Sequence, residues 1–184
     1  MLFSENDHPH HHLSNSNLIT KQKPFSLLHW LPKTSIKMSV FEGTYIIRSA
    51  LSQRKPVDLE ASNPTGRLIG YTYHGGPNQQ WRFTHINNDE FSIQNVATST
   101  YAAAPSGNDA TIKAARTDPK GNAAARWKIV RANAGADTWY IRSVASSSKT
   151  WDVTGSNQAD LTAIINYPFH GGVNQQFTLT RLGC

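Results

Sequence analysis

Two stretches of the chain repeat the same polar and aromatic residues in the same order. They run from Gly70 to Trp81 and from Asn166 to Phe177, and from their second residue onward both read aromatic-x-aromatic-His-Gly-Gly-x-Asn-Gln-Gln-aromatic. Packing of a hydrophobic core explains the last aromatic residue, but it does not explain a repeated His, Gly-Gly, Asn and Gln. These side chains offer hydrogen-bond donors, acceptors and flat rings. They indicate recognition of a polar ligand that has an apolar face.

A sugar is such a ligand, because its hydroxyl groups donate and accept hydrogen bonds and its C–H groups form an apolar patch. A carboxylate or amide and a flat ring match these groups. An aspartate between apolar neighbours precedes each stretch, and strand alternation is expected to turn its carboxylate away from the core. The candidate carbohydrate-binding residues are Asp58, Tyr71, His74, Asn78 and Gln79 in the first set, and Asp152, Tyr167, His170, Asn174 and Gln175 in the second.

Both sets belong to a threefold repeat between Val40 and Leu182. Tyr45, Phe91 and Trp139 each precede an isoleucine by two positions, at intervals of 46 and 48 residues. Short alternating segments bounded by Gly, Asn, Ser or Pro follow in every copy, which predicts an all-β fold. The expected strands are 43–49, 56–59, 68–71 and 80–83, then 89–95, 101–103, 111–114 and 126–130, then 137–143, 151–153, 163–166 and 176–179.

A unit of about 46 residues cannot bury its own apolar face, so three units around a pseudo-threefold axis are expected to share one core. Large aromatic residues should dominate that core, because each buries about 150–250 Å². The expected core residues are Tyr45, Ile47, Leu59, Trp81, Phe83, Phe91, Ile93, Trp127, Ile129, Trp139, Ile141, Val153, Phe177 and Leu179.

Gln-x-Trp in a threefold repeat resembles the ricin-B-type (R-type, QxW) lectins. The His-Gly-Gly-x-Asn-Gln-Gln-Trp spelling and the lack of cysteine pairs are similar to the cytoplasmic fungal members, and the resemblance covers residues 40–182. It implies a β-trefoil of three pseudo-repeats of four strands that binds glycans without catalysis, through two shallow sites in repeats one and three. It also implies that the aspartates accept from hydroxyls, the asparagines donate or accept, the tyrosines stack, the glutamines orient the aspartates and the histidines add a polar contact.

The middle copy departs from this pattern. Ala102 is taken to stand at the aspartate position, and Ala124-Ala125 replace Asn-Gln, so repeat two is expected to be structural. Ile69 and Phe177 also differ from the family pattern, which leaves the sugar open. Glycans of the galactose or N-acetylgalactosamine type are the candidate partners, and a homodimer would double the valency.

Other functions are less well supported by the residues. A β-trefoil protease inhibitor acting through the loops at 105–107 or 132–135 is the main alternative, because one fold hosts several functions. Glycoside hydrolysis needs two carboxylates, and the nearby pair Asp58 and Glu60 has no counterpart in repeat three. The scattered basic residues indicate a solvated surface rather than a nucleic-acid stripe. No enzyme activity and no cofactor or metal are expected.

Composition limits the class of protein further. The 184 residues carry a net charge of +6 and include one cysteine, Cys184, which excludes an internal disulfide and a Cys/His zinc site of ordinary spacing. No apolar run is long enough for membrane insertion. Residues 1–37 are expected to be a disordered N-terminal extension before a lectin domain at 38–184. Their apolar segment at 25–31 is too short for a convincing signal peptide, so a cytoplasmic location is expected.

Overall fold

The computed structural model describes residues 40, 42–133 and 137–183. The extension predicted at 1–37 and the domain start predicted at Met38 lie outside these residues, as does part of the loop at 132–135. Within the described residues there is no helix long and apolar enough to cross a membrane.

Six strands form a closed antiparallel barrel, in which each strand pairs with a neighbour on both sides. Closure satisfies the backbone hydrogen-bonding groups along both edges of these strands, and this is how a barrel avoids exposed edges. In order around the barrel the strands are β1 (Gly43–Ser49), β4 (Trp81–Asn87), β5 (Glu90–Asn95), β8 (Trp127–Arg131), β9 (Trp139–Ser143) and β12 (Phe177–Leu182).

Three hairpins form a second layer of the domain. They are β2 (Val57–Leu59) with β3 (Leu68–Gly70), β6 (Tyr101–Ala103) with β7 (Lys113–Ala115), and β10 (Lys149–Val153) with β11 (Thr162–Pro168). Their inner strands join one another, because β11 pairs with β3 and two bridges, Arg67–Lys113 and Thr111–Ile165, complete the circle.

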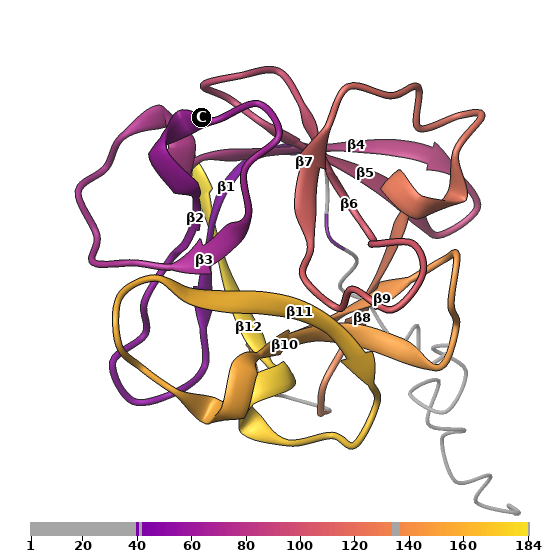
Figure 1. The fold of residues 1–184 in the computed structure, drawn as a ribbon. Helices are drawn as coiled ribbons and strands as arrows, with labels where there is room; N and C mark the ends of the chain where they lie inside the picture. The colour runs from indigo at the N-terminus through magenta and orange to yellow at the C-terminus, as the bar shows by residue number, and fades with distance from the viewer. Residues whose placement is uncertain (1–39, 41, 134–136, 184) are drawn as a thin grey trace, which may run out of the picture. The chain divides into compact units, whose positions relative to one another are not determined.

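The predicted β-trefoil is confirmed by this arrangement. Repeat one contains β1–β4, repeat two β5–β8 and repeat three β9–β12, and each repeat gives two strands to the barrel and one hairpin to the second layer. Figure 1 shows the three repeats as three lobes, with repeat one in indigo and purple and repeat three in orange and yellow. Short 3-10 turns follow the second strand or precede the fourth: η2 (Glu60–Ser62), η3 (Pro77–Gln79), η4 (Ala123–Ala125), η5 (Thr154–Ser156) and η6 (Val173–Gln175).

The core lies between the barrel and the hairpins. Most of the predicted core residues are buried, but Ile129 and Leu179 are only partly buried and pack against the edge of the cluster. Besides the predicted Leu59 and Val153, the segments of the second layer turn inward five apolar side chains larger than alanine that the prediction missed. These are Val57, Leu68, Ile112, Trp151 and Ile164.

The three repeats fill the core with side chains of different size. Trp81 Nε1 donates to the carbonyl of Val57 and Trp127 Nε1 to that of Ala102, both at 2.9 Å, so Val57 and Ala102 are equivalent. Trp151 takes the same place in repeat three and is fully buried. Its ring packs edge-on against Trp127 at 5.4 Å and Phe177 at 6.1 Å. The extra volume of Trp151 therefore occupies space that a small Ala102 and a phenylalanine at 177 would leave empty.

Replacing Trp81 tests the importance of this core. Trp81→Ala should lower the free energy of unfolding by about 3–5 kcal/mol, since it removes a fully buried indole and leaves a cavity. Trp81→Phe is the matched control and should cost less, because Phe177 fills the equivalent place in repeat three. Denaturant unfolding followed by circular dichroism measures both values, and a loss below about 1 kcal/mol for Trp81→Ala would contradict the assignment.

Candidate functional site

A buried carboxylate with three N–H donors directed at it is the centre of the candidate site in repeat one. Asp58 lies in β2 and is 3% exposed. Its Oδ1 accepts from Asn78 Nδ2 at 2.9 Å, and its Oδ2 accepts from Gln79 Nε2 at 2.9 Å and from His74 Nε2 at 3.1 Å. Four of the five residues predicted for this site are thus in direct contact.

Repeat three contains the same arrangement. Asp152 in β10 is also 3% exposed, and it accepts from Asn174 Nδ2 at 2.8 Å, Gln175 Nε2 at 2.9 Å and His170 Nε2 at 3.2 Å. The agreement extends to the ring contacts, because Tyr71–His74 and Tyr167–His170 both have centroids 6.2 Å apart at 76°. The two constellations are therefore copies in space as well as in sequence.

Gln79 connects the carboxylate to the loop that carries the histidine. Its Nε2 donates to Asp58 and to the carbonyl of Thr72, while its Oε1 accepts from the backbone N–H groups of His74 and Gly75. All the hydrogen-bonding groups of this amide are used, and the side chain is fully buried. Gln79 therefore positions Asp58 and cannot itself touch a ligand. Gln175 makes the corresponding four bonds in repeat three.

The two glycines of the repeated loop are required for different reasons. Gly75 has φ +72 and Gly171 has φ +76, a left-handed conformation that favours glycine. Gly76 has an ordinary φ of −65. A Cβ there would lie 2.7 Å from the His74 ring and 2.8 Å from Asn78 Oδ1, so only glycine lets these two side chains approach. Gly172 is equally crowded.

The hydrogen bonds fix the tautomer of the histidine. His74 Nδ1 accepts from the backbone N–H of Gly76 at 3.2 Å, so the proton of the neutral ring lies on Nε2 and points to Asp58. His170 has the same contacts. Both imidazoles are therefore donors to a carboxylate, with side chains that are 44% and 47% exposed.

An open pocket of about 430 Å³ lies above this constellation in repeat one. Four of the candidate residues from the sequence line it: Asp58, Tyr71, His74 and Asn78. Burial raises the pKa of the Asp58 carboxyl against the opposing effect of the Gln79 and His74 hydrogen bonds. The prediction missed the other lining residues, which the repeated motif does not contain. These are Glu60, Ala61, Ile69 and Leu161.

Leu161 is the lining residue with the weakest sequence signal, because it belongs to repeat three and reaches the pocket of repeat one across the β3–β11 pairing.

The motif also contains a second aromatic residue whose role the prediction left open. Arg48 stacks on Tyr73 and Arg142 on Phe169, each with 4.4 Å between the guanidinium carbon and the ring centroid. These stacks cover exposed rings beside each candidate site.

Repeat two has no such constellation, and the structure corrects one position in the prediction. Ala102 is the equivalent of Val57, as its carbonyl contact shows, so Ala103 rather than Ala102 occupies the aspartate position. The spacing of the two repeats differs, because Trp127 follows Ala102 by 25 residues whereas Trp81 follows Val57 by 24. Ala124 and Ala125 still lie in η4 where Asn78 and Gln79 lie in η3, so repeat two lacks both the carboxylate and the amides.

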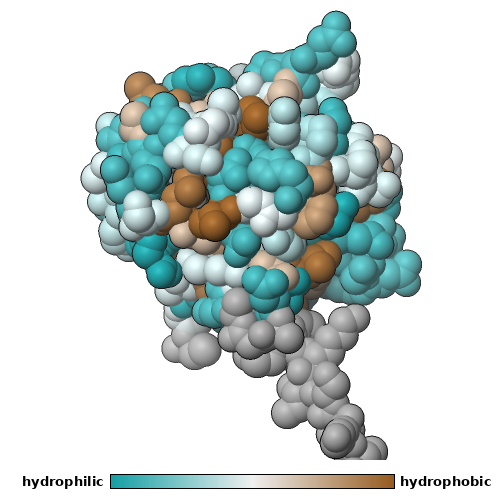
Figure 2. All heavy atoms as spheres, turned by 90° about the horizontal axis from the view of Figure 1, so that it is seen from below, coloured by the Kyte–Doolittle hydropathy of each residue, from teal (hydrophilic) through white to brown (hydrophobic). Residues whose placement is uncertain are grey.

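No group of three or more His, Cys, Asp or Glu side chains that could hold a metal ion occurs among the described residues. The face of the molecule in Figure 2 is largely hydrophilic, with apolar residues in separate spots.

Adding a methyl group at Gly76 tests the geometry of the site. Gly76→Ala should push the His74 ring away from Asp58, because the backbone accepts alanine but the new Cβ collides with His74 and Asn78. The ring Nε2–H signal of His74 in NMR spectra should shift or disappear, while that of His170 stays. Gly121→Ala is the control, since its backbone is not left-handed and a Cβ there meets nothing closer than 4.0 Å. An unchanged His74 signal would show that the approach is not tight.

Comparison with known proteins finds similarity to one family. Residues 77–167 match the family described as ricin-type beta-trefoil lectin domain-like. No curated protein sequence matches the chain.

Solved structures share the fold. The Rhizoctonia solani agglutinin is 25% identical with a TM-score of 0.68, covering 79% of this chain and 99% of its own. The designed threefold-symmetric protein ThreeFoil is 24% identical with a TM-score of 0.69, covering 76% and 99%. The Macrolepiota procera ricin B-like lectin, solved in complex with lactose, is 23% identical with a TM-score of 0.64, covering 78% and 99%. The resemblance seen in the sequence is therefore confirmed: part of the chain matches the ricin-type lectin family, and the fold is that of the ricin-B-like β-trefoil lectins.

Proposed function

We propose that this protein is a lectin that binds glycans, without catalysis, through two shallow sites centred on Asp58 and Asp152. The observation that carries the proposal is the duplicated constellation: a carboxylate held by three N–H donors beside a tyrosine ring, present in repeats one and three and absent from repeat two. A framework that only closed the turn would not need a carboxylate, because repeat two closes the equivalent turn with alanines.

The unused hydrogen-bonding capacity of the site suits a sugar hydroxyl. Asp58 Oδ1 accepts one hydrogen bond in the structure, so it keeps one acceptor position for a ligand. Asn78 uses both protons of its amide, on Asp58 and on the carbonyl of Leu59, which leaves its Oδ1 as an acceptor only. Tyr71 and Tyr167 supply flat rings for the C–H face of a pyranose. Two hydrogen bonds and one stacked ring support roughly millimolar to high-micromolar binding per site.

The ligand class is supported by a solved relative, the Macrolepiota procera lectin in complex with lactose. We propose glycans of the galactose or N-acetylgalactosamine type as the first ones to test. Two sites on one domain would give avidity for surfaces that carry many glycans. The homodimer and the cytoplasmic location expected from the sequence stay predictions.

A glycosidase is disfavoured by the state of Glu60. Arg67 donates two hydrogen bonds to it, from Nε at 2.8 Å and from Nη2 at 2.6 Å, and this lowers the pKa of the Glu60 carboxyl. A general acid needs the opposite shift. Thr154 holds the place of Glu60 in repeat three, so the pair of carboxylates is not duplicated where the Asp58 constellation is.

Neutralising the two aspartates tests the proposal. On a glycan array, Asp58→Asn and Asp152→Asn should each weaken binding, and the double variant should abolish it, because each amide removes an acceptor and turns a donor toward the N–H groups around it. Tyr71→Ala and Tyr167→Ala repeat the test without touching the buried carboxylates. Binding by the double variant at the level of the wild type would overturn the proposal, provided that circular dichroism shows both proteins folded.

Acid should release the ligand from site one. In the Asp152→Asn background, binding should fall as the pH drops through the raised pKa of Asp58, at a midpoint above the ordinary value of 3.8. Folding stability should depend on pH in the opposite direction to ligand binding. A raised pKa means that the folded state holds the proton of Asp58 more tightly than the unfolded state does. The Asp58 contribution to the free energy of unfolding therefore improves as the pH falls. Calorimetric titration across the acidic range measures the midpoint, and undiminished affinity at pH 3.8 would contradict the role of an ionised Asp58.

A further inference from the structure

Leu161 is an exposed apolar residue held in an unfavourable backbone conformation at the rim of the repeat-one pocket. Its φ is +68, in the left-handed region that a branched side chain rarely adopts, and it is 53% exposed. Its backbone N–H donates to the carbonyl of Gly70 at 3.0 Å. Strain of this kind persists only where the surrounding structure imposes it, and it is concentrated at functional sites.

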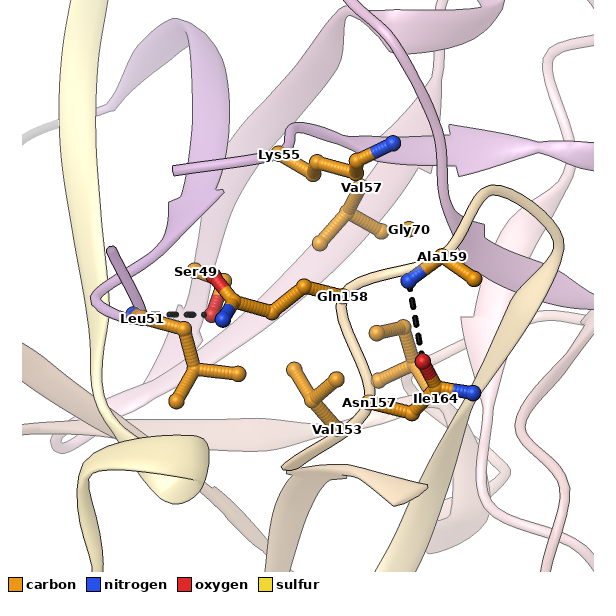
Figure 3. Close-up of a pocket in the computed structure, with 10 residues that line it drawn as sticks. All are labelled: Ser49, Leu51, Lys55, Val57, Gly70, Val153, Asn157, Gln158, Ala159 and Ile164. Carbon is orange, nitrogen blue, oxygen red and sulfur yellow. Dashed lines mark hydrogen bonds between the residues drawn. The ribbon is translucent and has the colours of Figure 1, made fainter. Parts of the chain in front are cut away.

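The segment before Leu161 is fixed to repeat one by side chains. Asp160 forms an ion pair with Lys55 and accepts from Thr72 Oγ1 at 3.0 Å. Gln158 Oε1 accepts from the backbone N–H of Gln53 at 2.7 Å. Figure 3 shows how this loop lies over Lys55, Val57 and Gly70, with only a cavity of about 10 Å³ between them. The contacts determine the position of Leu161 in relation to a pocket whose other lining residues all belong to repeat one.

Repeat three differs at the corresponding place. Ala163 pairs with Ile69, and Thr111 pairs with Ile165, so counting back two residues from each makes Asp109 the counterpart of Leu161. Asp109 is charged and forms an ion pair with Lys113 at 2.8 Å. The paired isoleucines differ as well. Ile69 is 1% exposed, whereas its counterpart Ile165 is half-buried, so the accessible apolar side chain that distinguishes site one is Leu161 and not the isoleucine.

The second apolar wall has a chemical consequence for the ligand. A hexose has one apolar face, on which the Tyr71 ring can stack, while its edges carry hydroxyl groups. Leu161, with Ala61, adds an apolar surface that a hydroxyl-bearing edge does not match. A methyl-bearing substituent matches it, as in an acetamido sugar or a 6-deoxy sugar.

We propose that Leu161 determines specificity in site one, selecting sugars that place a methyl-bearing substituent against it, and that site three lacks this preference. The inference rests on the proposed function, since it assigns a ligand class to one of the two sites. One methyl group transferred from water to an apolar wall corresponds to a preference of about fourfold.

The test uses single-site proteins on an array of matched sugars. Asp152→Asn leaves site one, and Asp58→Asn leaves site three. The pairs are galactose with N-acetylgalactosamine, galactose with D-fucose, and glucose with N-acetylglucosamine, so that acetamido and 6-deoxy groups are separated. Site one should prefer the methyl-bearing member of at least one pair by about fourfold, and site three should show no such preference.

Leu161→Asn in the site-one protein should remove the preference without harming the fold, because asparagine accepts a left-handed backbone more readily than leucine. Leu161→Met should retain the preference. Ser99→Asn, at another exposed position with φ +57, is the matched control. The inference is wrong if sugars bind but Leu161→Asn leaves the ratios unchanged, or if site three shows the same preference. Failure of the wild-type protein to bind any sugar would instead overturn the proposed function.

Discussion

The candidate sites depend on the placement of a carboxylate that is almost completely buried yet still has an acceptor position directed outward. A buried charge is costly unless it is hydrogen-bonded, and each aspartate has three N–H partners. These partners come from one short loop, so the same bonds that stabilise the charge also fix the loop. The glutamine is the link, because its amide joins the aspartate to the backbone of the His-Gly-Gly turn.

Threefold symmetry in the barrel allows the repeats to diverge on the surface. Repeat two retains its tryptophan and the hydrogen bond from that indole to the hairpin, so it contributes to the core while lacking the polar site. A large core side chain in one repeat also compensates for smaller ones elsewhere, as Trp151 does where it packs against Trp127 and Phe177. The domain therefore needs one shared core of the right total volume, not three equal repeats.

The sequence predicts the features that follow from periodicity and from repeated spelling. Alternating strands, the trefoil and the grouping of Asp58 with His74, Asn78 and Gln79 could all be read from the pattern. The packing of Trp151 against Trp127 could not, because it depends on how repeats two and three meet in the core. The register of Ala103 depends on hairpin and loop lengths that differ between repeats one and two, and these are not marked by any motif. Leu161 lies outside the motif, and only the pairing of β3 with β11 brings it to the pocket.

NMR mapping of the asparagine side-chain amides during titration with the strongest array ligand tests the two-site account most directly. The account predicts that the Nδ2–H₂ signals of Asn78 and Asn174 both shift, whereas that of Asn122, the cap of η4 in repeat two, does not. A shift at Asn122 with no change at Asn78 and Asn174 would contradict it, since the ligand would then bind where no carboxylate is present.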